Sequence, residues 1–241
     1  MNKNKTMDKL TEDQKKRMME AGQAAMNMSH GLKNIVQSLR SGQEVMDLAL
    51  EKRDFKQARR TWHILRQNLD RIQKLVLDTL KFSKDEALNL QPCDINRLIQ
   101  SVAETLLPQA DQRQICIDVQ IDDSLGQVPM DPEKMRDVVM NLLMNAIEAV
   151  ESKTGQVQIQ TELDQHSRQM ILRVSDNGHG IEDTSVIFEP FQSTKGNVGT
   201  GLGLTITQHI IQKHGGTIEA QSPPDKGSIF TVRIPMEMPR T

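Results

Sequence analysis

An uninterrupted heptad of apolar and small residues near the N-terminus constrains the fold of this chain most strongly. Between Met18 and Ala49 these residues recur in alternating steps of three and four, which keeps them on one stripe of a long helix. The stripe comprises Met18, Ala21, Ala25, Met28, Leu32, Ile35, Leu39, Gly42, Met46 and Ala49. Thr11 and Gln14 fit a capping box at the start of this helix. The pattern therefore predicts a helix of about ten turns.

A second helix is predicted after Asp54, which fits an N-cap with Gln57 completing a capping box. Its stripe comprises Phe55, Ala58, Trp62, Leu65, Leu69, Ile72 and Val76, flanked by Leu80. The two helices predict an antiparallel hairpin that turns near residues 51–54. One hairpin leaves its stripe partly uncovered, so we expect two copies to pair into a four-helix bundle. The alternative is a monomer that folds the stripe onto its own second domain.

After residue 83 the pattern changes to alternating helices and strands. We expect helices at 95–110, 132–150 and 201–214, and strands at 115–121, 156–162, 169–175, 217–221 and 229–234. Their spacing is not that of a doubly wound fold, and it favours an α/β sandwich with helices on one face of a mixed or antiparallel sheet. The chain is therefore predicted to be α+β. We expect a flexible N-terminus (1–10), the hairpin (11–83), a linker (84–89), the sandwich (90–236) and a tail (237–241).

Composition excludes several classes of function. The net charge of −2 and the aromatic content of 2% give no reason to expect a nucleic-acid partner. No apolar run reaches the roughly 18–20 residues that span a bilayer, so we expect no direct insertion into a membrane. The two cysteines have apolar neighbours and do not suggest a disulfide framework. We therefore expect a reducing compartment, the cytoplasm.

Two amide side chains share a face of the helix expected at 132–150. Asn141 and Asn145 are four residues apart, which is the spacing of neighbours on a helix surface. Amide oxygens suit a hard cation that keeps much of its water, as Mg²⁺ does beside phosphates. The alternative is that both side chains only cap or solvate the helix.

A carboxylate ends the apolar strand expected at 169–175. Asp176 can accept a hydrogen bond from an exocyclic amine such as that of adenine, and Gly178 and Gly180 let the backbone turn and approach a ring. The alternative is an ordinary Asp-Asn-Gly turn.

Glycines also lead into the helix expected at 201–214. Gly199, Gly201 and Gly203 precede a helix N-terminus, where free N–H groups and the helix dipole favour phosphate. The segment 183–198 would then be a lid that carries Phe188, Phe191 and Lys195, with Lys195 either near the terminal phosphates or solvated. The pattern matches neither a P-loop nor a Rossmann motif.

These stretches occur in a fixed order within about 65 residues. Asn141–Ala146, Asp176–Gly180, Phe188–Phe191 and Gly199–Leu204 resemble the N, G1, F and G2 boxes of the sensor histidine kinase ATP-binding domain. Residues 90–236 resemble the histidine kinase branch of the GHKL-type ATPases, which also include gyrase and MutL. Relatives that hydrolyse ATP have a glutamate base where this chain has Asn141, so the resemblance favours phosphoryl transfer over free hydrolysis.

The resemblance implies ATP and Mg²⁺ as cofactors, with Asn145 as the metal ligand and Asn141 supporting the phosphate and metal end. It assigns nucleotide contacts to Asn141, Asn145, Asp176, Gly178, Gly180, Phe188, Lys195, Gly199, Thr200, Gly201, Leu202 and Gly203. Glu148 stands where some relatives carry a basic phosphate contact, which implies a modest affinity for the triphosphate.

One of the six histidines, His30, has a sequence context of its own. It falls opposite the apolar stripe, and Lys33, Asn34 and Gln37 give the helix a polar face around it. An exposed imidazole with a free nitrogen is a suitable nucleophile for a γ-phosphate. The alternative is a solvent-facing histidine without a role. The stretch 28–34 resembles the H-box of the dimerisation and phosphotransfer domain, in which His30 is the phosphoryl acceptor.

The match departs from the family at two positions. The acidic general base that usually follows the histidine is replaced by Gly31, and the proline that often lies five residues on is replaced by Ile35. The proton acceptor is therefore unassigned. Asn34 matches the position whose Thr or Asn orients water when such proteins dephosphorylate their partner, so we expect phosphatase activity to be relatively important.

The predicted function is autophosphorylation of His30 by ATP, followed by transfer to an aspartate on the receiver domain of a response regulator. The expected assembly is a homodimer through residues 11–83. One alternative is a nucleotide-binding scaffold, or a phosphatase with weak kinase activity. Another is an ATPase clamp of the gyrase type, which Asn141 and the N-terminal hairpin disfavour.

Overall fold

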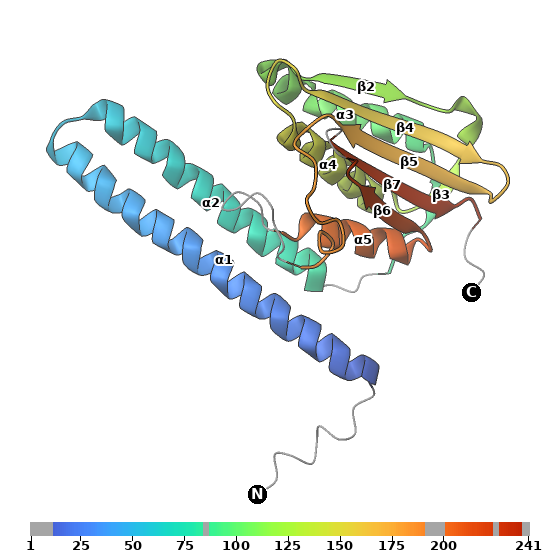
Figure 1. The fold of residues 1–241 in the computed structure, drawn as a ribbon, viewed down its shortest axis with the longest axis horizontal. Coiled ribbons are helices and arrows are strands. Elements are labelled where there is room, and N and C mark those ends of the chain that lie inside the picture. Colours follow the sequence, from blue (N-terminus) through green and yellow to red (C-terminus); the bar gives the residue numbers. More distant parts are fainter. Residues whose placement is uncertain (1–11, 84–86, 191–200, 224–226, 238–241) are drawn as a thin grey trace, which may run out of the picture. The chain divides into compact units, whose positions relative to one another are not determined.

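The computed structural model describes residues 12–83, 87–190, 201–223 and 227–237. For residues 12–28, His30 and residues 82–83 it describes the backbone alone. The chain divides into two compact units, a helical hairpin and an α/β unit, which are described separately (Figure 1). The predicted α+β class is confirmed. The expected N-terminus at 1–10, with Thr11 of the first capping box, lies outside the described residues.

The hairpin consists of α1 (Glu12–Glu51) and α2 (Phe55–Ser83). Its turn falls where the sequence predicts it, because the Asp54 carboxylate accepts a hydrogen bond of 2.9 Å from the Gln57 N–H and so caps α2. The Asp54 N–H donates to the carbonyl of Ala49 at 2.8 Å, closing the end of α1. Asp54 therefore holds the turn through both bonds, one to the start of α2 and one to the end of α1.

The apolar stripe predicted on α1 lies in the seam of the hairpin. Ile35 and Ala49 are buried, and Leu32, Leu39 and Met46 are half-buried. The seam is tightest at Gly42, where an added Cβ would lie 2.7 Å from a methyl carbon of Leu65. The stripe on α1 is thus confirmed over the residues whose side chains are described.

The stripe predicted on α2 is partly uncovered in the single hairpin, as expected. Ala58, Leu65 and Ile72 lie in the seam, but the alternate members face outward: Phe55, Trp62, Leu69, Val76 and Leu80 are 72, 58, 53, 48 and 53% exposed. Their places in the seam are taken by Thr61, Asn68 and Leu75. The outward residues form a second apolar row beside the seam.

Polar residues enter the seam because their hydrogen bonds are satisfied within the hairpin. The Thr61 hydroxyl donates to the carbonyl of Gln57 at 3.0 Å, and the Asn68 amide donates to Ile64 O at 2.9 Å and to the Ser38 hydroxyl at 3.3 Å. A paired polar group costs little when buried. A search for apolar periodicity passes over such positions, which is why Thr61 and Asn68 were not predicted.

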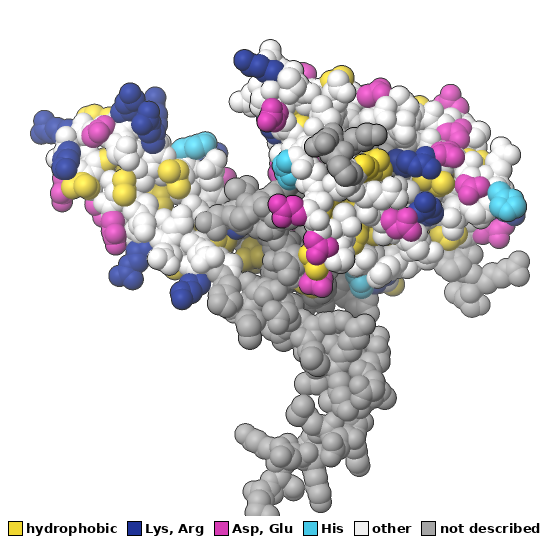
Figure 2. All heavy atoms as spheres, viewed as in Figure 1, with side chains coloured by type: hydrophobic (Ala, Val, Ile, Leu, Met, Phe, Trp, Pro, Cys, Tyr) yellow, Lys and Arg dark blue, Asp and Glu magenta, His cyan; other side chains and the backbone are white. Residues whose placement is uncertain are grey.

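Lysine and arginine side chains gather near the hairpin turn (Figure 2). They are Lys52, Arg53, Lys56, Arg59 and Arg60, all of them exposed. This agrees with a solvated polar face at the end of the hairpin. Within the described ranges, no helix combines the length and the apolar character needed to cross a membrane.

Over its described residues, the α/β unit contains three helices and two sheets. Its helices are α3 (Ile95–Arg113), α4 (Pro132–Ala149) and α5 (Gly203–Lys213), with a 3-10 turn η2 (Asp123–Leu125). Its strands are β1 (Gln91–Cys93), β2 (Cys116–Gln120), β3 (Val128–Met130), β4 (Gln156–Asp164), β5 (Gln169–Asp176), β6 (Thr217–Gln221) and β7 (Ser228–Pro235). The large sheet has the order β2-β4-β5-β7-β6, with only β2 and β4 parallel. The expected mixed sheet is confirmed.

The helices cover one face of this sheet (Figure 1). Alternate residues of the central strands, such as Ile159, Leu172 and Val232, are completely buried in the core with α3 and α4. The strands thus alternate apolar and polar residues, as expected for a sheet with one solvated face. Two features were not predicted: α3 extends three residues beyond the expected end at 110, to Arg113, and β1 and β3 form a small separate sheet.

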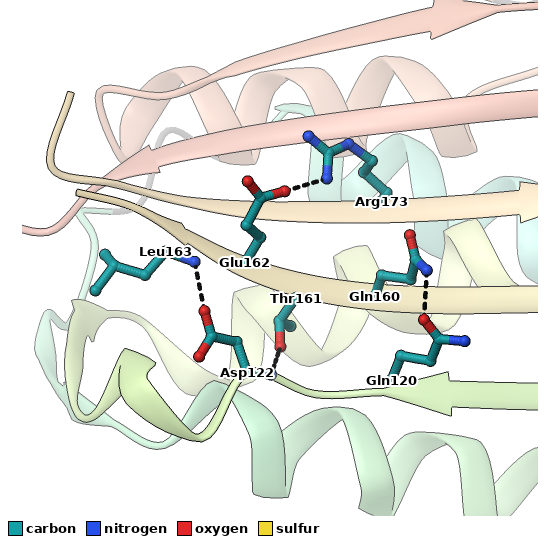
Figure 3. A network of polar contacts seen from close by, with 7 residues as sticks. All are labelled: Gln120, Asp122, Gln160, Thr161, Glu162, Leu163 and Arg173. Atoms are coloured by element: carbon teal, nitrogen blue, oxygen red, sulfur yellow. Dashed lines mark hydrogen bonds and ion pairs between the residues drawn. The ribbon is translucent and has the colours of Figure 1, made fainter. Parts of the chain in front are cut away.

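Polar side chains on β2, β4 and β5 bond to one another (Figure 3). Gln160 donates to Gln120 at 2.6 Å, and Arg173 donates to Glu162 at 2.5 Å. At the end of β2 the Asp122 carboxylate accepts from the Leu163 N–H at 2.9 Å. A hydrogen bond from the Ser124 hydroxyl, followed by backbone N–H bonds, lowers the pKa of the Asp122 carboxyl. These bonds tie the edge strand β2 to β4, and β4 to β5.

Candidate functional site

Helix α4 carries the two predicted amides. It begins at the cap Asp131, whose carboxylate accepts from the N–H groups of Glu133 and Lys134 at 3.1 Å, and Pro132 occupies the first helical position as predicted. Asn141 and Asn145 lie on this helix and are both half-buried. The helix therefore places both amides on one face, beside its fully buried apolar residues.

The Asn141 side chain is oriented by α5. Its Nδ2 donates to the hydroxyl of Thr207 at 2.9 Å, and Thr207 is buried. The amide oxygen lies against Gly203, where an added Cβ would come within 2.4 Å of Oδ1. Gly203 is thus required for α5 to begin this close to α4. Because Thr207 holds the nitrogen, the oxygen is the atom turned toward the first turn of α5.

Asp176, the last residue of β5, is a buried carboxylate that is 6% exposed. One oxygen accepts from the Gly178 N–H at 2.8 Å, and the other accepts from the Ser228 hydroxyl at 2.5 Å. Burying a charge is tolerated only where its acceptor sites are bonded. The side chain is therefore held in one orientation by its own loop and by the neighbouring strand.

The loop after Asp176 rests on the end of α4. An added Cβ at Gly178 would lie 2.4 Å from the carbonyl oxygen of Ala149, so no other residue can approach this closely. The His179 N–H donates to the same carbonyl at 3.3 Å. Gly180 has a φ of +73° and turns the chain toward Ile181, whose N–H donates to the Ser222 hydroxyl at 2.7 Å.

The glycine-rich segment is described from Gly201 onward. Gly201 has a φ of +68°, Leu202 is completely buried and Gly203 begins α5. Phe188 is half-buried against the core, and its carbonyl accepts from the Thr205 hydroxyl at 3.0 Å. Lys195, Gly199 and Thr200 lie outside the described residues, as do Phe191 and the rest of the second half of the expected lid, 191–198.

Three side chains that hold this site were missed from the sequence. Ser228 bonds to Asp176, Ser222 bonds to the loop at Ile181, and Thr207 bonds to Asn141. Ser228 is the direct partner of Asp176 in the ladder between β5 and β7. The contact between Ser228 and Asp176 follows from the register of β5 against β7, and the amino-acid pattern does not determine that register.

Comparison with known proteins agrees with this geometry. Residues 130–238 match the family model described as the histidine kinase-, DNA gyrase B- and HSP90-like ATPase. The catalytic domain of the histidine kinase ThkA is 31% identical, with a TM-score of 0.56, and the match covers 62% of this chain and 99% of that domain. The chain belongs to the sensor histidine kinases.

Two further similarities extend over the hairpin of this histidine kinase. The sensor histidine kinase ZraS of Escherichia coli (strain K12) is 29% identical over 228 residues, which are 94% of this chain and 48% of ZraS. The chain thus spans about half the length of ZraS. The structure of ThkA in complex with the response regulator protein TrrA covers 95% of this chain and 68% of that one at 22% identity, with a TM-score of 0.69, and it shows likeness of fold.

The kinase's expected acceptor, His30, lies on α1, but its side chain is outside those described. The surrounding positions agree with the predicted face: Lys33, Asn34 and Gln37 are exposed. Gly31 is half-buried, and among the described atoms outside its own helix backbone and chain neighbours none lies within 4 Å of a Cβ added there. A side chain at position 31 therefore meets no obstacle within the hairpin.

A buried histidine connects the two helices of the candidate site, α4 and α5. His214 follows α5, and its Nδ1–H donates to Ile210 O at 2.8 Å while Nε2 accepts from the Asp131 N–H at 3.0 Å. Only a neutral ring can make both bonds. Burial lowers the pKa of His214, although the bond to Ile210 and the nearby Asp131 carboxylate oppose this. His214 thus links the end of α5 to the cap of α4.

We predict that this ring makes the kinase domain sensitive to mild acid. Because the native pKa of His214 lies below its ordinary value of about 6.5, the unfolded chain binds more protons below that pH. Its contribution to stability is complete above pH 6.5 and is lost as the pH falls toward the native pKa. Urea unfolding between pH 8 and pH 5 should show the loss. His214→Gln, which does not titrate, should have a flatter profile, and equal slopes would contradict the prediction.

The Asp131 carboxylate, which caps α4, affects stability in a lower pH range than His214 does. Desolvation raises the pKa of Asp131, but N–H bonds from Asn89, Lys134 and Glu133 outweigh it and lower the pKa below its ordinary value. Its stabilising effect is therefore present above about pH 4 and is lost below that pH. A loss of stability between pH 6.5 and pH 5 would therefore be attributed to His214 and not to Asp131.

Proposed function

We propose that this chain binds ATP with Mg²⁺ and transfers the γ-phosphoryl group to His30. The observation that carries the proposal is the buried Asp176 carboxylate, held by Ser228 and Gly178 next to the end of the helix that bears Asn141 and Asn145. A fixed acceptor of this kind suits the exocyclic amine of adenine. The amides and the first turn of α5 supply groups that suit a phosphate chain and its cation.

In the proposed reaction an imidazole nitrogen of His30 attacks the γ-phosphorus. The bond from phosphorus to the bridging oxygen breaks, and ADP leaves with both electrons of that bond. Asn145 would hold Mg²⁺, which neutralises charge on the phosphates when it is bound. Asn141 replaces the glutamate that activates water in hydrolysing relatives, so it cannot act as a base for hydrolysis. The phosphohistidine then donates its phosphoryl group to an aspartate of a response regulator.

The partner and the compartment are part of the same proposal. ThkA has been crystallised with a response regulator, which supports a receiver domain as the partner of this chain. The dependence on ATP and the free cysteines Cys93 and Cys116 support a cytoplasmic location. Asn34 is exposed on α1 near His30 in sequence, which supports the hypothesis of a phosphatase reaction in which its amide orients water. An Asn34→Ala variant that dephosphorylates the regulator normally would contradict that hypothesis.

The test is incubation with γ-labelled ATP and Mg²⁺, comparing the parent with His30→Gln. We expect a label that is acid-labile, alkali-stable and absent from the variant, because phosphohistidine has that stability pattern. His63→Gln is the matched control, since His63 is an exposed histidine on α2. A chain that binds ATP without taking up label would favour the scaffold or phosphatase alternative. Partner binding that persists in Asn145→Ala without phosphate transfer would identify a scaffold.

We also propose that the chain forms a homodimer through residues 11–83. The outward apolar row on α2 supports this, since Phe55, Trp62, Leu69 and Val76 are each about half exposed or more. Val36 and Leu50 of α1, which are 56 and 53% exposed, add to the apolar surface of the hairpin. Solvent exposure of so many large apolar side chains is unusual for a monomer. A second copy of the hairpin would cover them in a four-helix bundle.

The dimer is tested by one charge placed in this row. Trp62→Glu should sediment as a monomer at concentrations at which the parent is a dimer, because an unpaired carboxylate cannot be buried without a large cost. Ile64→Glu is the matched control, because Ile64 is 49% exposed but lies on the other side of α2. A Trp62→Glu variant that remains dimeric would show that the row is not the interface.

A further inference from the structure

Arg113, the last residue of α3, supplies the missing cap of α4. The last carbonyl groups of a helix have no partners within it, and α4 has no basic residue in its last turn and an extended residue, Val150, at its C-cap. The Arg113 guanidinium donates from Nη1 to Ile147 O at 2.7 Å and from Nη2 to Val150 O at 2.6 Å. Its Nε also lies 3.4 Å from the Ser152 hydroxyl.

These bonds suit the chemistry of an arginine. A planar guanidinium reaches two carbonyl groups at once, and its positive charge is favourable at the negative end of the helix dipole. The backbone adds a further connection, because the Lys153 N–H donates to Arg113 O at 2.9 Å. The end of α4 and the turn after it are thus held from the side of α3.

The expected adenine loop rests on the same turn of α4. Between the two carbonyls held by Arg113 lies Ala149, whose own carbonyl accepts from the His179 N–H and is in close approach to Gly178. The Asn177 side chain accepts from the Gln156 N–H at 2.7 Å and donates to Thr154 O at 3.0 Å. Residues 177–179 therefore take their position from the end of α4 and the connection that follows it.

We propose that Arg113 is a positioning residue for adenine recognition. By fixing the carbonyls on both sides of Ala149, it holds the loop that begins at Asp176, and hence the carboxylate that would meet the adenine amine. The inference rests on the proposed nucleotide function, and it assigns to α3 a role in the selectivity of the site. Asn141 and Asn145 lie further from the end of α4, so phosphate and metal binding depend less on this contact.

This predicts a loss of base selectivity without a loss of turnover. Without the guanidinium, two helix-end carbonyls lose their donors and the last turn of α4 frays, which moves Ala149 and the loop on it. The affinity of Arg113→Met for ATP should fall about tenfold. Its affinity for inosine triphosphate, which carries an oxygen in place of the adenine amine, should change little. At saturating ATP the rate of His30 labelling should be that of the parent.

The experiment measures the dissociation constants for ATP and for inosine triphosphate by calorimetry. The variants are Arg113→Met, Arg113→Lys and, as the reference for lost recognition, Asp176→Asn. Ile99→Val is the matched control: Ile99 is a fully buried residue of α3, so its truncation destabilises the same helix without touching the end of α4. The dissociation constant for inosine triphosphate divided by that for ATP measures the preference for adenine. This ratio should fall in Arg113→Met, fall less in Arg113→Lys and be unchanged in Ile99→Val.

The possible outcomes separate this inference from the proposed function. If Asp176→Asn loses the preference for ATP while Arg113→Met and Arg113→Lys keep it, the role of Arg113 is overturned and the nucleotide site stands. An equal loss of affinity for both nucleotides in the arginine variants also overturns it, because that is the effect of general destabilisation. If the parent chain does not distinguish the two nucleotides, the assignment of Asp176 fails and the role of Arg113 fails with it.

Discussion

Asp176→Asn should lower the affinity of this chain for ATP by about a hundredfold, or roughly 2.7 kcal/mol. The carboxylate uses both oxygens as acceptors, for the Gly178 N–H and the Ser228 hydroxyl. An amide replaces one acceptor oxygen with an NH₂ donor, so a single oxygen remains to accept hydrogen bonds and the NH₂ group faces other donors. A site built to hydrogen-bond one group rejects a mismatch strongly, since a buried polar atom is left unpaired.

Calorimetric titration with ATP and with ADP measures this effect directly. Asp164→Asn is the matched control, because Asp164 makes comparable bonds to the N–H of His166 and the hydroxyl of Ser167 at the other end of the β4–β5 pair. It should bind ATP as the parent does. Binding of ATP by Asp176→Asn with unchanged affinity would remove the carboxylate from the nucleotide site.

The division of the chain into a helical hairpin and an α/β unit follows from patterns that are local in sequence. Asp54 and Asp131 begin helices because each caps the N–H groups two or three residues on, so a short stretch of sequence contains the cause and the effect. Alternation predicts the strands for the same reason. The limit is reached on α2, where Asn68 lies in the seam because its amide bonds to Ser38, thirty residues away.

Contacts between distant segments explain why the site was only partly predicted. Asp176 and Asn141 could be found because each stands in a recognisable stretch. Ser228 could not, since it lies 52 residues from Asp176 and meets it only through the register of β5 with β7. Arg113 bonds to backbone carbonyl groups of α4. Every residue has such a group, so no pattern of side chains marks that contact.

Gly31→Glu should accelerate the labelling of His30 by about a hundredfold, the lower end of what a positioned general base contributes. The family usually has an acidic residue directly after the histidine, and in this chain the position is Gly31. A carboxylate there would accept the imidazole proton as the ring nitrogen attacks the γ-phosphorus. Since no atom in the described part of the hairpin obstructs an added Cβ within 4 Å, there is room for the side chain. Initial rates with γ-labelled ATP at saturating concentration measure the gain.

Any side chain at this position also stabilises α1, because glycine in a helix interior costs about 1 kcal/mol relative to alanine. Gly31→Gln separates the two effects, since glutamine has nearly the size and helix propensity of glutamate but accepts no proton. We expect Gly31→Gln to unfold at a higher temperature than the parent and to be labelled at the parent's rate. If the glutamine and glutamate variants were equally fast, the gain would come from helix rigidity. The proton would then leave His30 by a route that does not involve position 31.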